Sequence, residues 1–159
     1  MSLYSVDKLI EQTRSLAAEF RRTTGTMLPV SGEIARHDVS RHLGLTLCED
    51  RNCGYDAIGN GVLQGQRILI KSRVVGEQIR SQHRIGQLNP QGNWDFVVLS
   101  LMDEAFQPTE MYQASREDII DALDQVSSKR ARRGALSVAK FCIIAERVWT
   151  CERGRAVGF

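Results

Sequence analysis

The chain has 159 residues, of which 42% are hydrophobic and 25% charged, with 21 lysines and arginines against 19 aspartates and glutamates. This length suits one domain, and the hydrophobic content is too high and the net charge of +2 too low for a disordered chain. No apolar run approaches the roughly 18 residues that span a bilayer, and the first residues lack the apolar core of a secretory signal, so we expect a cytoplasmic protein without a membrane partner.

The first predicted element is an amphipathic helix over Ser5–Arg22, with Ser5 as its N-cap. Its apolar side consists of residues at spacings of three and four: Val6, Leu9, Ile10, Thr13, Leu16, Ala17 and Phe20. A second helix is expected over 32–43, because Gly44 stands where a helix commonly ends in the left-handed conformation.

The middle of the chain predicts short strands, and Asn60-Gly61 favours a reversing turn between two of them. The expected strands are 45–48, 55–58, 67–72, 94–102 and 107–112. Ser115 then caps a helix, and after a basic loop over 129–134 a last helix is expected to carry Val138, Phe141, Cys142, Ala145 and Trp149. This order predicts one α/β domain around a mixed central β-sheet flanked by helices.

The small net charge is the sum of opposed blocks. Residues 67–84 have a local net charge of +4, residues 103–124 of −6, and residues 129–155 of +6. Such asymmetry can create a basic face without a high isoelectric point. A shared basic face requires that Arg67, Lys71, Arg73 and the loop over 129–133 lie together, with the acidic helix over 118–124 pointing elsewhere.

The four cysteines are expected to be reduced thiols. They are Cys48, Cys53, Cys142 and Cys151. A structural zinc site with the three histidines is the alternative, but the spacings lack the paired C-x2-C pattern of zinc modules.

The candidate site combines Asp56 with the strand that contains Lys71. Alternate side chains share one face of a strand, so Ile68 and Ile70 are expected to point one way and Arg67, Leu69, Lys71 and Arg73 the other. Pairing with the strand that follows Asp56 could place its carboxylate beside Lys71. A carboxylate next to a lysine suits metal-assisted attack on a phosphodiester, and the two arginines could hold its backbone.

The segments 31–35 (SGEIA), 43–45 (LGL), 54–58 (GYDAI) and 68–73 (ILIKSR) resemble the PD-(D/E)xK nuclease superfamily. The chain looks like a poorly characterised bacterial branch with a restriction-endonuclease-like core. The resemblance continues through Trp94-Asp95 and through 133–141 (RGALSVAKF). It implies a single domain over 1–159, with a nuclease-like core at about 30–150 and a helical addition over 5–22.

The resemblance implies roles for individual residues. Asp56 and Glu33 would bind Mg²⁺ or Mn²⁺, and Lys71 would act as the catalytic lysine. The chain departs from the pattern at Leu69, two residues before the lysine, where a metal-ligating side chain is usual and leucine offers no oxygen. The expected nucleic-acid contacts are Arg67, Arg73, Lys129, Arg130, Arg132 and Arg133.

Two further functions stay open beside a metal-dependent endonuclease acting on DNA. The same fold could bind DNA or RNA without cleaving it, since Leu69 replaces a ligand. It could also recruit another protein through its acidic helix. A homodimer would suit cleavage of both strands, although the sequence does not indicate an apolar exposed face on the N-terminal helix.

Overall fold

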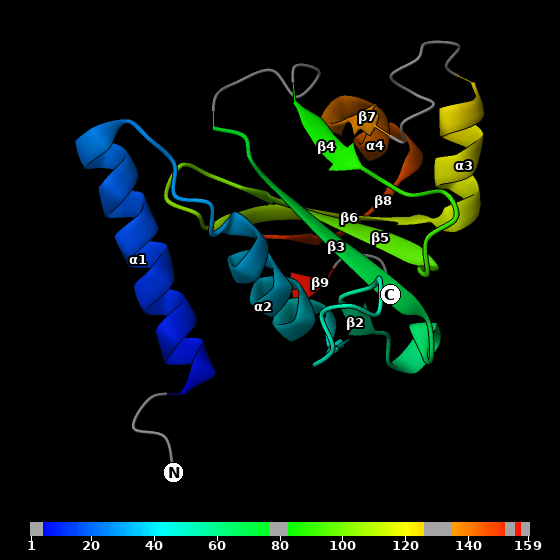
Figure 1. Cartoon of the computed structure of the whole chain (residues 1–159), viewed down its shortest axis with the longest axis horizontal. Coiled ribbons are helices and arrows are strands. Elements are labelled where there is room, and N and C mark those ends of the chain that lie inside the picture. The colour runs from blue at the N-terminus through cyan, green and yellow to red at the C-terminus, as the bar shows by residue number, and fades with distance from the viewer. Residues whose placement is uncertain (1–4, 77–82, 126–134, 152–154, 157–159) are drawn as a thin grey trace.

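The computed structural model describes residues 5–76, 83–125, 135–151 and 155–156, which form a mixed α/β structure (Figure 1). The helices in these ranges are α1 (Val6–Thr24), α2 (Ser31–Leu43), the short 3-10 helix η1 (Gly61–Leu63), α3 (Arg116–Asp124) and α4 (Val138–Ile144). The strands are β1 (Thr46–Leu47), β2 (Ala57–Ile58), β3 (Arg67–Val74), β4 (Arg84–Gln87), β5 (Phe96–Met102), β6 (Pro108–Ser115), β7 (Ala135–Ser137), β8 (Glu146–Thr150) and β9 (Arg155–Ala156).

Seven of the strands in the described ranges form one mixed sheet in the order β1-β2-β3-β5-β6-β8-β9. The central pair β3 and β5 is parallel, in a register that runs from Ile68 opposite Phe96 to Val74 opposite Met102. The other neighbours in this sheet are antiparallel. The mixed sheet flanked by helices that the sequence predicts is therefore confirmed.

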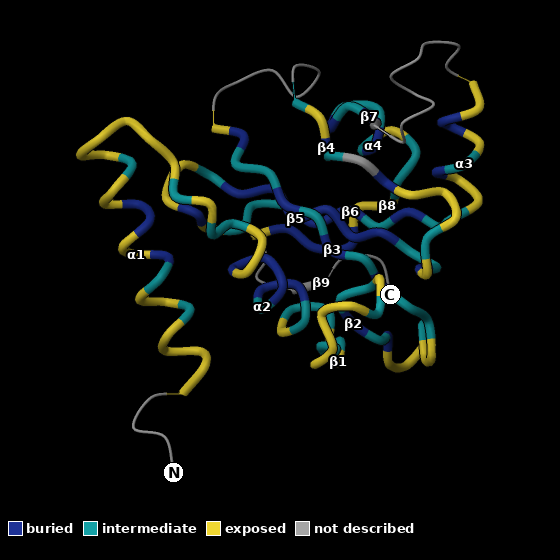
Figure 2. Tube along the Cα trace, viewed as in Figure 1, coloured by how far each residue is buried: buried dark blue, intermediate teal, exposed yellow. Residues whose placement is uncertain are grey.

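Each face of the sheet has its own buried core (Figure 2). On the first face, α1 and α2 pack over residues that include Ile68, Ile70 and Val98. On the second face, α3, α4, β4 and β7 pack over residues that include Val97, Leu99 and Leu101. This alternation along β5 is the period of two expected of a strand buried on both faces.

The connection between the parallel strands β3 and β5 runs over the second face. It contains β4, which pairs with β7 in a separate two-stranded sheet among the described residues. Neither β4 nor β7 is among the strands that the sequence predicts. Both strands are short and pair across a long stretch of chain, so no local pattern indicates them.

Two predictions about the helices are wrong, one of them in part. The last helix ends at Ile144, and Trp149 lies in β8, where it pairs with Met111 of β6. In α1 the buried residues are Arg14, Ala17 and Ala18, so the expected apolar side is confirmed at Ala17 but is exposed at its larger members, which are Val6, Leu9, Leu16 and Phe20. Both α1 and α2 otherwise match the expected ranges within two residues.

Among the described residues, no helix has the length and hydrophobicity required to cross a membrane.

Candidate functional site

The expected alternation of side chains along β3 is observed. Ile68 and Ile70 belong to the core beneath α2, while Leu69 packs against the core on the opposite face. Lys71 and Arg73 follow Leu69 at intervals of two, so they lie on that second face together with it. Lys71 stands opposite Leu99 of β5, and Arg73 stands opposite Leu101.

Asp56 directly precedes β2, which lies between β1 and β3, and each of its two carboxylate oxygens accepts a hydrogen bond. Oδ2 accepts a hydrogen bond from the backbone N–H of Ile70 at 2.7 Å, and Oδ1 accepts one from the guanidinium of Arg36. Arg36 projects from α2 and also donates to the carbonyl of Cys48 at 3.3 Å. Arg36 is not among the predicted site residues, and its one local signal in the sequence is its position one turn after Glu33.

Glu33 lies near this pair but is also bound by an arginine. Arg51 donates to both of its oxygens, at 2.5 and 3.1 Å. These hydrogen bonds hold the pKa of Glu33 below its usual value, against burial, which acts in the opposite direction. The charges of Arg36 and Arg51 act on both carboxylates, so Glu33 and Asp56 form a small cluster of alternating charge.

The donor set does not fit a divalent cation as the residues lie. Mg²⁺ prefers several oxygen ligands, yet each of the two predicted carboxylates is bound by an arginine and Leu69 supplies no oxygen. Within the described ranges, no group of three or more His, Cys, Asp or Glu side chains is arranged to hold a metal ion. An ion at Asp56 would have to displace Arg36.

Lys71 has a different environment from the two acids. It is half-buried and, among the described residues, has no ion pair and no hydrogen bond. Burial and then the positive charge of Arg73 lower the pKa of Lys71, while the charge of Asp56 acts in the opposite direction. The structure thus brings Asp56 within electrostatic range of Lys71, while Glu33 makes no such contribution.

Arg73 fastens β4 onto the sheet. Its guanidinium donates to the carbonyl of Arg84 in β4 and to the carbonyl of Ser72. A side chain at Gly86 would place its Cβ 3.1 Å from Nη2 of Arg73, so the glycine lets the guanidinium lie against the β4 backbone. Burial lowers the pKa of Arg73, and none of the described carboxylates forms an ion pair with it.

Arg67 forms an ion pair with Asp95. Its Nε and Nη2 atoms donate to the two carboxylate oxygens of Asp95, each at 3.0 Å, and its backbone N–H donates to Oδ2 at 2.8 Å. This pair joins the start of β3 to the start of β5. A further bond to Asn93 leaves Arg67 less available for phosphate than the sequence predicts.

The Arg67–Asp95 pair predicts a specific dependence of stability on pH. The hydrogen bonds from Arg67 hold the pKa of Asp95 below its ordinary value in the folded state. The stability that this pair contributes is therefore complete above about pH 4, where the unfolded carboxyl ionises, and is lost as pH falls through the folded pKa. We expect the free energy of unfolding, measured by urea titration, to fall less steeply with acidity in Asp95→Asn than in the wild type. Parallel curves would contradict this role.

The expected common basic face is only partly tested. Residues Lys129, Arg130, Arg132 and Arg133 lie outside the described residues. The acidic helix α3 covers the same face of the sheet as Leu69 through Ile119 and Leu123, while its residues Asp118, Asp121 and Asp124 are exposed, so the expected direction of its acidic side chains stays a prediction. The exposed Arg84 on β4 is a further positive charge on the Lys71 side of the sheet.

Two of the cysteines approach each other in the loop between β1 and β2. The sulfur atoms of Cys48 and Cys53 are 3.1 Å apart, and both residues are free thiols. The hydrogen bond between them raises the pKa of Cys48. Their position beside Arg51 places them at the charge cluster, but nothing among the described residues completes a zinc site around them.

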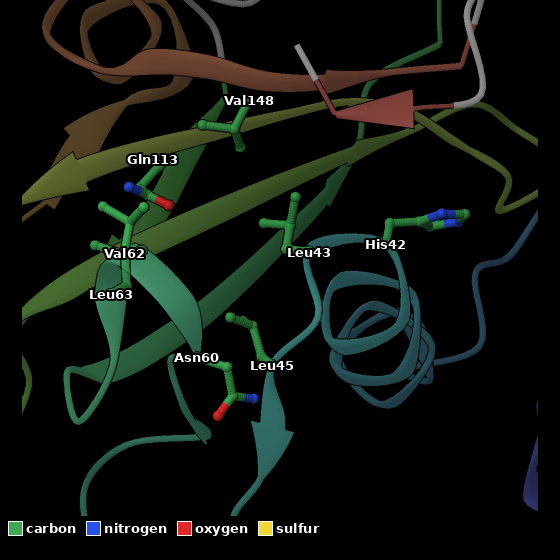
Figure 3. A pocket seen from close by; sticks show the side chains of 8 residues that line it. All are labelled: His42, Leu43, Leu45, Asn60, Val62, Leu63, Gln113 and Val148. Atoms are coloured by element: carbon green, nitrogen blue, oxygen red, sulfur yellow. The ribbon is translucent and has the colours of Figure 1, made fainter. Parts of the chain in front are cut away.

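A mostly apolar pocket of about 230 Å³ lies elsewhere, between the end of α2, η1 and the sheet (Figure 3). It is lined by His42, Leu43, Leu45, Asn60, Val62, Leu63, Gln113 and Val148. In Figure 3 the ring of His42 points away from the other side chains, and it stacks on Trp149 with centroids 4.6 Å apart. None of the residues predicted for the site lines this pocket.

No protein-family model matches the chain, and no curated protein matches it in sequence.

Proposed function

We propose that this chain is a nucleic-acid-binding module of restriction-endonuclease-like architecture, which holds phosphate groups at Lys71 and leaves the phosphodiester bond intact. The observation that carries the proposal is the half-buried ammonium of Lys71, which has no counter-charge in contact among the described residues. A positive charge that has already lost part of its hydration gains free energy when an anion binds beside it.

Neighbouring charges support a phosphate ligand. Arg73 and Arg84 place two further guanidinium groups on β3 and β4, and no described acid forms an ion pair with either. Phosphate contacts by lysine and arginine position a protein on nucleic acid without reading its sequence. The resemblance to the PD-(D/E)xK superfamily makes nucleic acid the expected source of that phosphate.

Binding without hydrolysis follows from the state of the two acids. Asp56 and Glu33 are both bound by arginine, and Leu69 stands where a ligand would be needed. The role that remains for Asp56 is to accept the hydrogen bonds of Arg36 and of the β3 backbone.

Lys71→Met is expected to weaken binding to a fluorescently labelled DNA duplex about fivefold at low salt. It should also reduce the slope of the logarithm of affinity against the logarithm of salt concentration by about 1, because one phosphate contact is lost. Fluorescence anisotropy across a salt series measures both quantities. Duplex DNA, single-stranded DNA and RNA are compared in the same way.

Arg41→Met is the matched control, since it removes one positive charge from an exposed position on α2, which covers the opposite face of the sheet. Equal effects of the two substitutions would refute a specific role for Lys71. Binding that is absent, or that does not respond to salt, would refute the nucleic-acid proposal and favour a protein partner.

Metal-dependent nuclease activity is the second candidate, favoured by one observation. Asp56 and Lys71 lie close enough for the carboxylate to oppose the lowering of the lysine pKa. Nicking of supercoiled plasmid in Mg²⁺ or Mn²⁺ by the wild type, and its loss in Asp56→Asn, would establish hydrolysis and overturn the non-catalytic proposal. We expect no nicking by either protein.

A further inference from the structure

Helix α1 presents a stripe of large apolar side chains to the outside of the molecule. Val6 is 56% exposed, Leu9 45%, Leu16 64% and Phe20 36%. Thr13 completes the series, and its hydroxyl donates to the carbonyl of Leu9 at 2.8 Å, so its polar atom is satisfied within the helix. These residues are separated by three, four, three and four positions, the spacing of a seam between two paired helices.

The stripe is distinct from the side of α1 that holds the helix to the protein. That side contains Ala17, Ala18 and Arg14, which are buried. At about 100° per residue, the exposed stripe lies roughly a third of a turn away from it. A partner on the stripe therefore does not compete with the packing of α1 against α2.

We propose that the exposed stripe of α1 (Val6, Leu9, Thr13, Leu16 and Phe20) pairs antiparallel with the same stripe of a second copy of this chain. The stripe is self-complementary about Thr13, which is the requirement for a two-fold interface. Reversing the helix about this residue sets Leu9 against Leu16 of the second copy, and the smaller Val6 against the larger Phe20.

The charges beside the stripe favour the antiparallel direction. Lys8 and Glu19 lie on the same flank of α1, at nearly equal distances on either side of Thr13. In an antiparallel pair, Lys8 of each copy lies at the height of Glu19 of the other. In a parallel pair the second copy of this flank would instead lie on the opposite side of the seam, so Lys8 and Glu19 of the two copies would not be brought together.

The charged residues of α1 also disfavour binding of the exposed stripe to a membrane surface. The charged residues of α1 that are not bound to the rest of the protein are mixed in sign, with Asp7, Glu11 and Glu19 among them. A helix that lies on a membrane surface typically has a polar side rich in lysine and arginine.

The expected interface is small. A helix of 19 residues is about 28 Å long, and pairing along its length buries roughly 1,000 Å² in total, the lower limit for a specific interface. We therefore expect a reversible dimer with a dissociation constant of about 10 μM. This proposal does not depend on nucleic-acid binding.

Sedimentation equilibrium of the full chain, from about 1 to about 100 μM, tests the dimer. Leu16→Glu is expected to raise the dissociation constant at least about a hundredfold, because it places charge in the centre of the seam. Ser15→Glu is the matched control: it adds the same charge at the next position, which is exposed on the opposite side of α1. Circular dichroism checks that both variants retain their helices.

Disulfide trapping tests the direction of pairing, in a chain whose four native cysteines are replaced by serine. Leu9→Cys mixed with Leu16→Cys is expected to give the mixed disulfide, and Leu16→Cys alone to remain unlinked. A monomer at every concentration, a dimer that Leu16→Glu leaves intact, or rapid linking of Leu16→Cys to itself would each overturn the proposal. So would flotation with phosphatidylcholine–phosphatidylglycerol vesicles in the absence of dimer.

Discussion

Replacing Arg14 with methionine is expected to lower the free energy of unfolding by about 3–5 kcal/mol. The Arg14 side chain is only 4% exposed and that of its partner Asp38 8%. Arg14 donates to both Asp38 oxygens, at 2.6 and 2.9 Å, and to the carbonyl of Phe106 at 2.6 Å. The substitution leaves the Asp38 carboxylate and the Phe106 carbonyl buried without this donor. The folded state is destabilised because water does not reach these oxygens to replace the lost hydrogen bonds.

Urea denaturation followed by circular dichroism measures the loss, and the chain offers a matched control. Arg22 forms an ion pair with Glu19 on the same helix, but both side chains are mostly exposed. Arg22→Met should therefore change the stability by less than about 0.5 kcal/mol. The double variant Arg14→Met/Asp38→Leu should lose less than the sum of its single substitutions, because it leaves no unpaired charge. A loss below about 1 kcal/mol in Arg14→Met would mean that α1 is not held by this pair.

Replacing Arg36 with methionine is expected to cost about 2–4 kcal/mol. The Arg36 side chain is 10% exposed and that of Asp56 20%, so the substitution leaves the largely buried Asp56 carboxylate with the Ile70 N–H as its one donor among the described residues. Arg51→Met is the matched control, because its pair with Glu33 is about half exposed and should contribute less than about 1 kcal/mol. Equal losses in the two variants would show that Arg36 has no special structural role.

The same variants test whether Asp56 can bind a metal ion. With Arg36 in place, we expect millimolar Mg²⁺ or Mn²⁺ to leave the melting temperature of the wild type unchanged. A rise in melting temperature that disappears in Asp56→Asn would instead mean that the ion displaces Arg36 from the carboxylate. That result would favour the nuclease over the non-catalytic module.

The helix pattern near the N-terminus predicts the existence of α1 but not its orientation. Residues at spacings of three and four lie on both its buried and its exposed sides, so the apolar pattern alone cannot distinguish them. The buried side contains Arg14, which a hydrophobicity pattern places in solvent. Its burial depends on Asp38, 24 residues later, and that pairing follows from tertiary structure alone.

Near the C-terminus, the sequence pattern predicts a helix where part of the segment forms a strand. Helical spacing from Val138 continues formally to Trp149, yet α4 ends at Ile144 and Ala145 is extended. The residues Val148 and Trp149 suit a strand, and the exposed edge of β6 was available to pair with them. The spacing of apolar residues within this segment contains no information about its pairing with β6.

Strand alternation is the part of the site that the sequence predicts well. It places Leu69 on the face opposite Ile68 and Ile70, as observed, because a period of two depends only on backbone geometry. It could not reveal that Arg36 and Arg51 bind the two predicted metal ligands. Those contacts depend on the path of the loop between β1 and β2, whose sequence has no regular pattern.

Because β4 pairs with β7, the cover of the second face of the sheet is completed only late in synthesis. β4 lies between the two parallel strands in sequence, yet its partner β7 follows it by about fifty positions. β3, β5 and β6 therefore leave the ribosome before the strand and helix that complete the cover of the second face. A nascent chain that ends before Ala135 therefore exposes the apolar core on the side of the sheet that contains Lys71.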